Sequence, residues 1–292
     1  MALINVGASL PSYTWAVTRL LIAAEGSLDA ESARLMLTPP ALLRTGDNDE
    51  YDAAIKTLAD LGIVQKTGGD IALGGEARAL LLDHVVGFNS LLRRAVLAPA
   101  GNIGIADSSD LEGPKDLVRA LAWFLTRDPA TSLDFDMVVN LQDGAFPSHL
   151  PPPFVNDVRW GYFVYWAPAL GFAARSLLDE GGRVKLVPDC TVAVRETMLS
   201  LWSSGQSVRP SEAIDRILVE LPVLPGGAYS RSLGLEVPEG GISPALSNAL
   251  LTGAEVGWIT LERDSDAIDV RFLADAGGSI GVSNITINGS DW

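Results

Sequence analysis

The sequence has very few of the residues that build disulfide scaffolds or metal centres. It contains one cysteine, Cys190, and two histidines, His84 and His149, among 292 residues. A single cysteine excludes an intrachain disulfide framework, and a zinc site would need several carboxylates as ligands, which is uncommon. We therefore expect no disulfide, no metal and no cofactor.

Long hydrophobic runs are lacking too. No apolar stretch approaches the roughly 18–20 residues needed to cross a bilayer, and residues 1–6 do not begin a secretory signal. We expect a cytoplasmic protein without a membrane partner. Hydrophobic residues still make up 48% of the chain, which is enough to fill cores and excludes a disordered protein.

Basic residues are scarce. The chain has 21 Lys and Arg against 36 Asp and Glu, a formal net charge of −15. Nucleic-acid binding usually relies on a basic surface that neutralises phosphates and releases counterions. DNA contact would therefore require the few cations to gather on one face. The simpler interpretation is that the acidity keeps the protein soluble.

The first part of the chain carries a pattern of helices. Three helices are predicted over 12–24, with Ser12 as cap, over 27–38, opened by Ser27, and over 47–61. The second ends before Pro39-Pro40, because proline lacks a donor and restricts the residue before it. In the third, Tyr51, Ile55 and Leu58 recur at the spacing of one buried helical face.

A ribbon follows these helices. Gly62 is expected to end the third helix in a left-handed conformation. Residues 63–66 and 70–73 predict two strands joined at Gly68-Gly69, and a further helix is predicted over 76–84. Three helices followed by a two-stranded ribbon resemble the winged-helix fold.

The same order of elements returns later in the chain. The second copy comprises helices at 117–126 and 154–170, Gly171, strands at 172–177 and 184–187 around a turn at 180–182, and a helix at about 191–202. The third comprises helices at about 214–221 and from Ser243, a hairpin pairing 258–261 with 268–272, and a strand at 280–287. Such repetition indicates the architecture.

We therefore predict an α+β, mainly helical fold of tandem winged-helix modules, each a helix-turn-helix with a β-wing. Stretches rich in Gly, Ser and Pro at 99–114 and 203–210 mark the boundaries. The predicted modules are a winged helix at 1–100, a second winged-helix-like module at 101–204 and a C-terminal α+β winged-helix-like module at 205–292.

Signatures of catalysis are missing. The chain has no phosphate-binding loop, no His-Glu-x-x-His and no Gly-x-Ser-x-Gly. Asp134 and Asp136 have the spacing of a metal site but no further ligands nearby, so a helix start or loop is the better interpretation. Cys190 has no histidine near it in sequence. We predict a protein that is not an enzyme; a composite site completed by a partner stays open as an alternative.

The third predicted helix is acidic where a recognition helix would meet DNA bases. Its first residues are Asp47, Asn48, Asp49, Glu50 and Asp52. Because carboxylates are repelled by phosphates, we expect this helix to stay out of a DNA groove. Any DNA contact would then use a wing or linker, and its candidate residues are Arg44, Lys66, Arg93 and Arg94.

One predicted helix is unusually aromatic. It contains Trp160, Tyr162, Phe163, Tyr165 and Trp166, too many rings for one buried stripe. Three interpretations stay open: burial on two sides between modules, a partner-docking surface formed by Trp160, Tyr162, Tyr165 and Trp166, or a platform that stacks a base.

Several short stretches resemble a known family. They are Trp166–Phe172, Leu186–Arg195, Glu220–Leu224 and Gly227–Tyr229. They resemble DpdG, a component of bacterial gene clusters that place 7-deazaguanine derivatives in DNA and restrict unmodified DNA. The resemblance implies a role in DNA modification, restriction or anti-phage defence, beside a helicase or nuclease subunit. It supplies no active-site residues.

These observations predict a non-enzymatic adaptor or scaffold subunit of a bacterial DNA-modification or anti-phage defence system. It would dock protein subunits of the same defence complex through winged-helix surfaces. The alternative is a winged-helix DNA-binding protein or transcriptional regulator, which the net charge disfavours.

Overall fold

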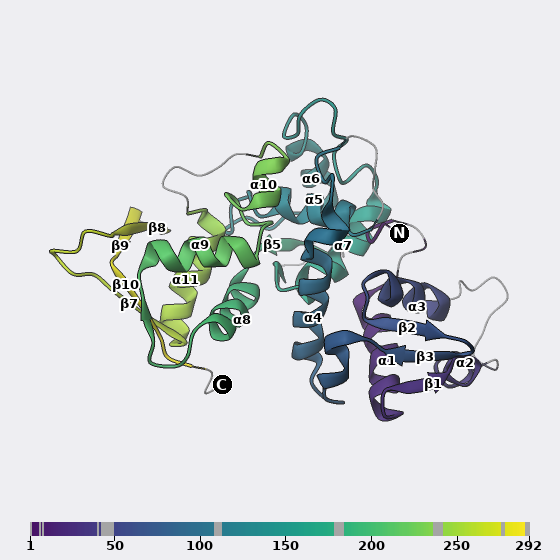
Figure 1. Cartoon of the computed structure of the whole chain (residues 1–292). Helices are drawn as coiled ribbons and strands as arrows, with labels where there is room; N and C mark the ends of the chain where they lie inside the picture. Colours follow the sequence, from purple (N-terminus) through teal and green to yellow (C-terminus); the bar gives the residue numbers. More distant parts are fainter. Residues whose placement is uncertain are drawn as a thin grey trace. The chain divides into compact units, whose positions relative to one another are not determined.

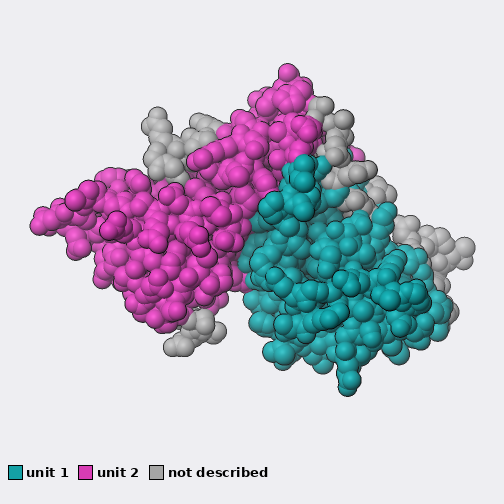
Figure 2. Space-filling model, viewed as in Figure 1, with its two compact units in different colours: residues 1–103, 111–117, 158–170 teal, residues 104–110, 118–157, 171–292 magenta. Residues whose placement is uncertain are grey.

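The computed structural model describes residues 2–5, 7, 9–39, 41, 50–107, 113–177, 184–235, 242–275 and 278–289. In these residues the fold is α+β and mainly helical, with small antiparallel sheets, as predicted (Figure 1). The chain divides into two compact units (Figure 2): unit 1 is 1–103, 111–117 and 158–170, and unit 2 is the remainder. The division into three modules stays a prediction.

Unit 1 begins with helices packed beside a three-stranded sheet. In chain order the elements are α1 Pro11–Ala23, β1 Ser27–Asp29, α2 Ala30–Leu37, α3 Glu50–Asp60, β2 Val64–Thr67 and β3 Asp70–Leu73. The antiparallel sheet has the order β1-β3-β2. Ile55 and Leu58 of α3 are buried, as their spacing predicts. Gly62 and Gly68 have φ of 71° and 63°, so the predicted helix end and ribbon turn are confirmed.

Two predicted helix starts are wrong. Helix α1 begins at Pro11, because proline suits the first turn, and not after a Ser12 cap. Ser27 lies in β1, where it pairs with Ala72, so it does not open a helix. Asp29 caps α2 instead, and its carboxylate accepts a hydrogen bond from the Ser32 amide at 2.8 Å. The start predicted at Asp47 lies outside the described residues.

The rest of unit 1 is helical. It contains the 3₁₀ helices η2 Gly75–Ala79 and η3 Pro99–Asn102, helix α4 Val85–Leu97, the first turn of α5 (Lys115–Phe124) and nearly all of α7 (Asp157–Ala169). The helix predicted at 76–84 is wrong, because η2 ends at Ala79 and α4 begins only at Val85. Phe88 of α4 packs against Trp15 of α1, with ring centroids 5.1 Å apart.

A buried carboxylate ties the N-terminal segment to unit 1. Asp116 of α5 is 1% exposed and accepts hydrogen bonds from the amides of Leu3 at 2.9 Å and Ile4 at 2.8 Å. Further along, the Ser9 amide donates to Thr57 Oγ1 of α3 at 3.4 Å. The Ser9 carbonyl accepts from the Trp166 indole of α7 at 3.1 Å. The segment is thus anchored to three helices of the same unit.

Unit 2 combines helices with short strands. Besides the remainder of α5, its elements are α6 Phe135–Leu141, β4 Ala173–Arg175, β5 Leu186–Pro188, α8 Thr191–Leu201, β6 Ser207–Val208, α9 Pro210–Glu220, α10 Ala228–Ser232, α11 Pro244–Val256, β7 Ile259–Glu262, β8 Arg271–Asp275, β9 Gly278–Val282 and β10 Asn284–Ile287. Helices α8 and α11 pack together, and α11 also contacts β7 and β8.

The second predicted ribbon is present in shorter form. Strands β4 and β5 pair antiparallel, with Ala174 opposite Val187. Gly171 has the expected left-handed φ of 77°. A side chain there would lie 2.9 Å from the Ala193 amide nitrogen, so the site requires glycine for space as well. The predicted turn at 180–182 lies outside the described residues.

The predicted pairing in the third copy is wrong. β7 pairs with β10, with Leu261 opposite Ile285, and β8 pairs with β9. β10 also pairs with β6, and its buried Ile285 and Ile287 give this three-stranded sheet an apolar face. The single strand predicted at 280–287 is two strands that are separated at Ser283.

Candidate docking surfaces

The described residues contain no group of three His, Cys, Asp or Glu that could hold a metal ion. Asp134 caps α6 by accepting a hydrogen bond from the Met137 amide at 3.1 Å, and Asp136 lies in the first turn of that helix. The interpretation of this pair as a helix start is therefore confirmed.

Cys190 is enclosed by the fold. Its side chain is fully buried, and the thiol donates to the Ala245 carbonyl at 3.4 Å. Burial raises the pKa of the thiol far above its ordinary range, so the reactive thiolate is disfavoured at neutral pH.

We expect Cys190 not to react with Ellman's reagent in the folded protein and to release one equivalent of product after denaturation. Rapid reaction in buffer alone, at the rate of a free thiol, would contradict this. Cys190→Ala, which releases no product in either state, is the control.

The aromatic helix α7 is only partly available to a partner. Trp160 and Trp166 are buried, and Trp160 stacks on Phe163 with centroids 5.6 Å apart. Tyr162 is half-buried and Tyr165 is exposed. Of the four predicted docking residues, only Tyr162 and Tyr165 are accessible to a partner. The two tryptophans pack inside unit 1.

The predicted cations have different environments. Arg93 is 4% exposed, and its guanidinium donates to the Leu170 carbonyl at 3.1 Å and to Ser90 Oγ at 3.2 Å. Arg94 is exposed and forms an ion pair of 2.7 Å with Glu76. Lys66 lies exposed on β2, and Arg44 lies outside the described residues. The buried Arg93 guanidinium is therefore inaccessible to a DNA phosphate, and that of Arg94 is already paired with Glu76.

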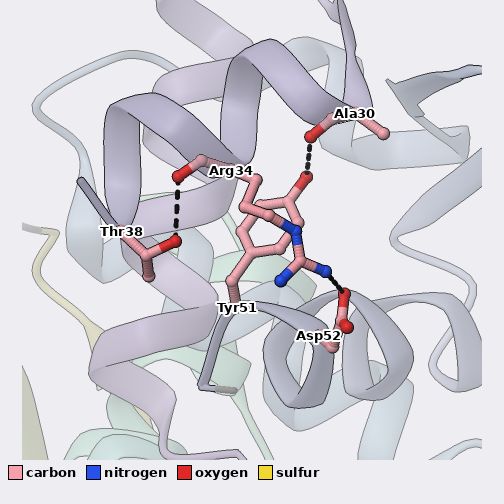
Figure 3. Close-up of polar contacts among 5 residues, drawn as sticks. All are labelled: Ala30, Arg34, Thr38, Tyr51 and Asp52. Atoms are coloured by element: carbon pink, nitrogen blue, oxygen red, sulfur yellow. Dashed lines mark hydrogen bonds and ion pairs between the residues drawn. The ribbon is translucent and has the colours of Figure 1, made fainter. Parts of the chain in front are cut away.

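The surface where a recognition helix and wing would meet DNA has its own organisation (Figure 3). We call it the ribbon face: helix α2, the first turns of α3, and the β2–β3 ribbon. Arg34 of α2 forms an ion pair with Asp52 of α3, and its guanidinium carbon lies 5.0 Å from the centroid of the Tyr51 ring. The Tyr51 hydroxyl donates to the Ala30 carbonyl at 2.9 Å. These contacts join α2 to α3.

Burial raises the pKa of the Tyr51 hydroxyl, and Arg34 lowers it by a smaller amount. This hydroxyl therefore stays protonated and acts as a hydrogen-bond donor. Among its described residues the ribbon face carries four acidic side chains, Glu31, Glu50, Asp52 and Asp70, and three basic ones, Arg34, Lys56 and Lys66. The ribbon face is thus slightly net negative and lacks the basic excess that phosphate contact needs.

A second surface of unit 1 is apolar. We call residues 80–86 the apolar segment, since Leu81, Leu82, Val85 and Val86 are all exposed, Leu81 to 64% and Val86 to 52%. Beside it is a hollow of about 550 Å³. The hollow is lined by Ile22, Glu25, Gly26, Ser27, Ala72, Leu73, Arg78 and Leu80.

The sequence does not predict this surface, because its pattern favours a helix over 76–84. A signal was available in Leu80-Leu81-Leu82 and Val85-Val86, which are separated by only Asp83-His84. Five apolar residues in seven positions fit neither a single helical stripe nor a strand alternation. Such a run marks either a core or an exposed docking segment.

Comparison with known proteins gives one family match. No curated protein and no solved structure matches it. No helix in the described parts of the chain is long and apolar enough to cross a membrane. The model of a family described as DpdG-like matches residues 1–267, which takes in all of unit 1 and stops before β8. The chain therefore belongs to the DpdG-like family.

Proposed function

We propose that the chain is a non-enzymatic adaptor subunit of a bacterial DNA-modification and defence system, and that it docks other proteins of that system through unit 1. Family membership suggests a role in the Dpd modification system. The order α1–β1–α2–α3–β2–β3 supports a winged-helix module at the start of the chain. We extend the proposal to tandem winged-helix modules along the chain.

The observation that carries the adaptor proposal is the apolar segment. Leu81, Leu82, Val85 and Val86 lie in solvent, although most large apolar side chains of unit 1 are buried. The hollow beside them has mixed walls, apolar at Ile22, Leu73 and Leu80 and charged at Glu25 and Arg78. Exposed contiguous apolar surface is typical of protein–protein contact sites. Helices commonly dock into such grooves through residues spaced by one turn.

We expect the chain to co-purify with at least one protein encoded beside its gene when they are co-expressed. Leu81→Ser combined with Leu82→Ser should reduce the retained partner about tenfold or more, because docked apolar anchors carry much of the affinity. The control is Val192→Ser with Val219→Ser, which removes two exposed apolar side chains from unit 2. Failure of the unaltered chain to retain any of these proteins would contradict the adaptor role.

The alternative is a DNA-binding protein. It is supported by the winged-helix order of elements and by the exposed Lys66 on the ribbon. The acidic ribbon face and the pairing of Arg34 and Arg94 argue against it. A DNA affinity that falls steeply with salt, and that Lys66→Glu abolishes, would favour this alternative over the adaptor.

A further inference from the structure

The ribbon face exposes apolar side chains next to carboxylates. On α2, Leu35 is 49% exposed and Met36 is 61% exposed. Leu35 follows Glu31 by four positions, so the two side chains lie on the same side of the helix. The solvent side of α2 therefore combines an apolar pair with a negative charge.

A small hollow adjoins this helix. It measures about 160 Å³, the volume of roughly five water molecules, and is enough for the end of one long side chain. Its walls come from α2, α3 and the ribbon and include Glu31, Ile55, Asp70 and Ile71. Within the described part of the chain, neither Glu31 nor Asp70 forms an ion pair.

Two positive side chains, Arg34 and Lys66, line this hollow together with Glu31, Asp52 and Asp70, and Arg34 is held in place. Arg34 stacks on Tyr51 and is neutralised by Asp52, as Figure 3 shows. The backbone carbonyl of the same residue accepts from Thr38 Oγ1 at 2.9 Å at the end of α2. Three carboxylates therefore face two cations, Arg34 and Lys66, so the hollow stays net negative and an incoming group has to be cationic to gain from it.

We propose that the ribbon face docks a basic amphipathic helix of a partner protein. Apolar residues of that helix cover Leu35 and Met36, and a lysine or arginine enters the hollow between Glu31 and Asp70. The inference rests on the proposed adaptor function and specifies the chemistry of one partner. The ribbon face is a surface separate from the apolar segment. Its negative charge, which opposes contact with DNA, would attract a basic partner helix.

The probe is a fluorescent helical peptide of two heptads of leucine and lysine, titrated against the full chain and followed by anisotropy. Its counterpart has glutamate in place of every lysine. We expect the lysine peptide to bind at least tenfold more tightly than the glutamate peptide. Glu31→Lys with Asp70→Lys should weaken binding of the lysine peptide about tenfold. Leu35→Ser with Met36→Ser should weaken it about fivefold.

The matched control is Asp215→Lys with Glu220→Lys, which reverses two exposed charges on α9 and leaves the ribbon face intact. We expect less than a twofold change. An equal loss in this control would show that net charge alone attracts the peptide and would overturn the proposal. Preference for a DNA duplex over the lysine peptide at the same salt would also overturn it.

Circular dichroism at increasing temperature checks that each variant is folded. The peptide experiment and the co-purification experiment test different surfaces. If the peptide does not bind, while Leu81 and Leu82 still control partner retention, the ribbon-face proposal is overturned and the adaptor role stands. If no partner is retained, while the peptide still binds at Glu31 and Asp70, docking through the apolar segment is overturned.

Discussion

Replacing Arg93 with glutamate should lower the free energy of unfolding by about 3–5 kcal/mol, because it leaves a buried charge without its partners. The Arg93 guanidinium donates to the Leu170 carbonyl just beyond the end of α7 and to Ser90 of its own helix. A cation at a helix C-terminus is also favoured by the helix dipole. A carboxylate at the same place faces a carbonyl oxygen and the negative end of that dipole.

Urea unfolding followed by circular dichroism measures this loss. The neighbouring Arg94→Glu is the control, since Arg94 is exposed and its ion pair with Glu76 is worth at most about 1 kcal/mol. Equal stability of the two variants would contradict the buried role of Arg93. For the same reason, a gel-shift test of DNA binding is informative with Lys66 and Arg94, and misleading with Arg93.

Removing the Asp116 carboxylate should cost about 3 kcal/mol in Asp116→Leu, because amides of Leu3, Ile4 and Leu117 then lose their acceptor. Asp116→Asn keeps one acceptor oxygen and should cost about half as much. Urea unfolding again gives the values, with the exposed Asp215→Asn as control. A loss below about 0.5 kcal/mol in Asp116→Leu would contradict the anchoring role.

The same residue gives a pH dependence with a definite sign. Burial raises the pKa of the Asp116 carboxyl above its ordinary 3.8, although the Ile4, Leu3 and Leu117 amides and Arg159 lower it. In the unfolded chain the Asp116 carboxyl has its ordinary pKa, and in the folded chain its pKa is higher. At a pH between these two pKa values, the folded chain therefore binds more protons than the unfolded chain. The stability of the unaltered protein relative to Asp116→Asn should therefore fall as the pH rises through this window. A rise instead would mean that the pKa is lowered.

Local patterns predicted the first ribbon and the helix before it. The spacing of Tyr51, Ile55 and Leu58 located α3, and Gly62 and Gly68 located its end and the turn. Serine suits a helix cap, so the sequence predicts a helix start at Ser27, yet Ser27 lies in strand β1 and pairs with Ala72, which is far away in sequence. Such tertiary pairing overrides a local preference.

The candidate sites were less predictable than the fold. Arg93 and Arg94 are adjacent in sequence, but a helix turns about 100° between them, so one is buried and the other is exposed. The aromatic pattern predicts Trp166 as a docking anchor, yet its indole donates to the Ser9 carbonyl, a contact that no short-range pattern reveals. The acidity of the ribbon face, by contrast, was visible at once in the composition of the third helix.

The anchored N-terminal segment has a practical consequence for expression and engineering. Leu3, Ile4 and Ser9 connect to α5, α3 and α7 at once. A protease that cuts between Ile4 and Ser9 would release Leu3 and Ile4 from α5 and leave the buried Asp116 without two of its amide donors. Purification tags and cleavage sites are therefore better placed away from residues 3–9.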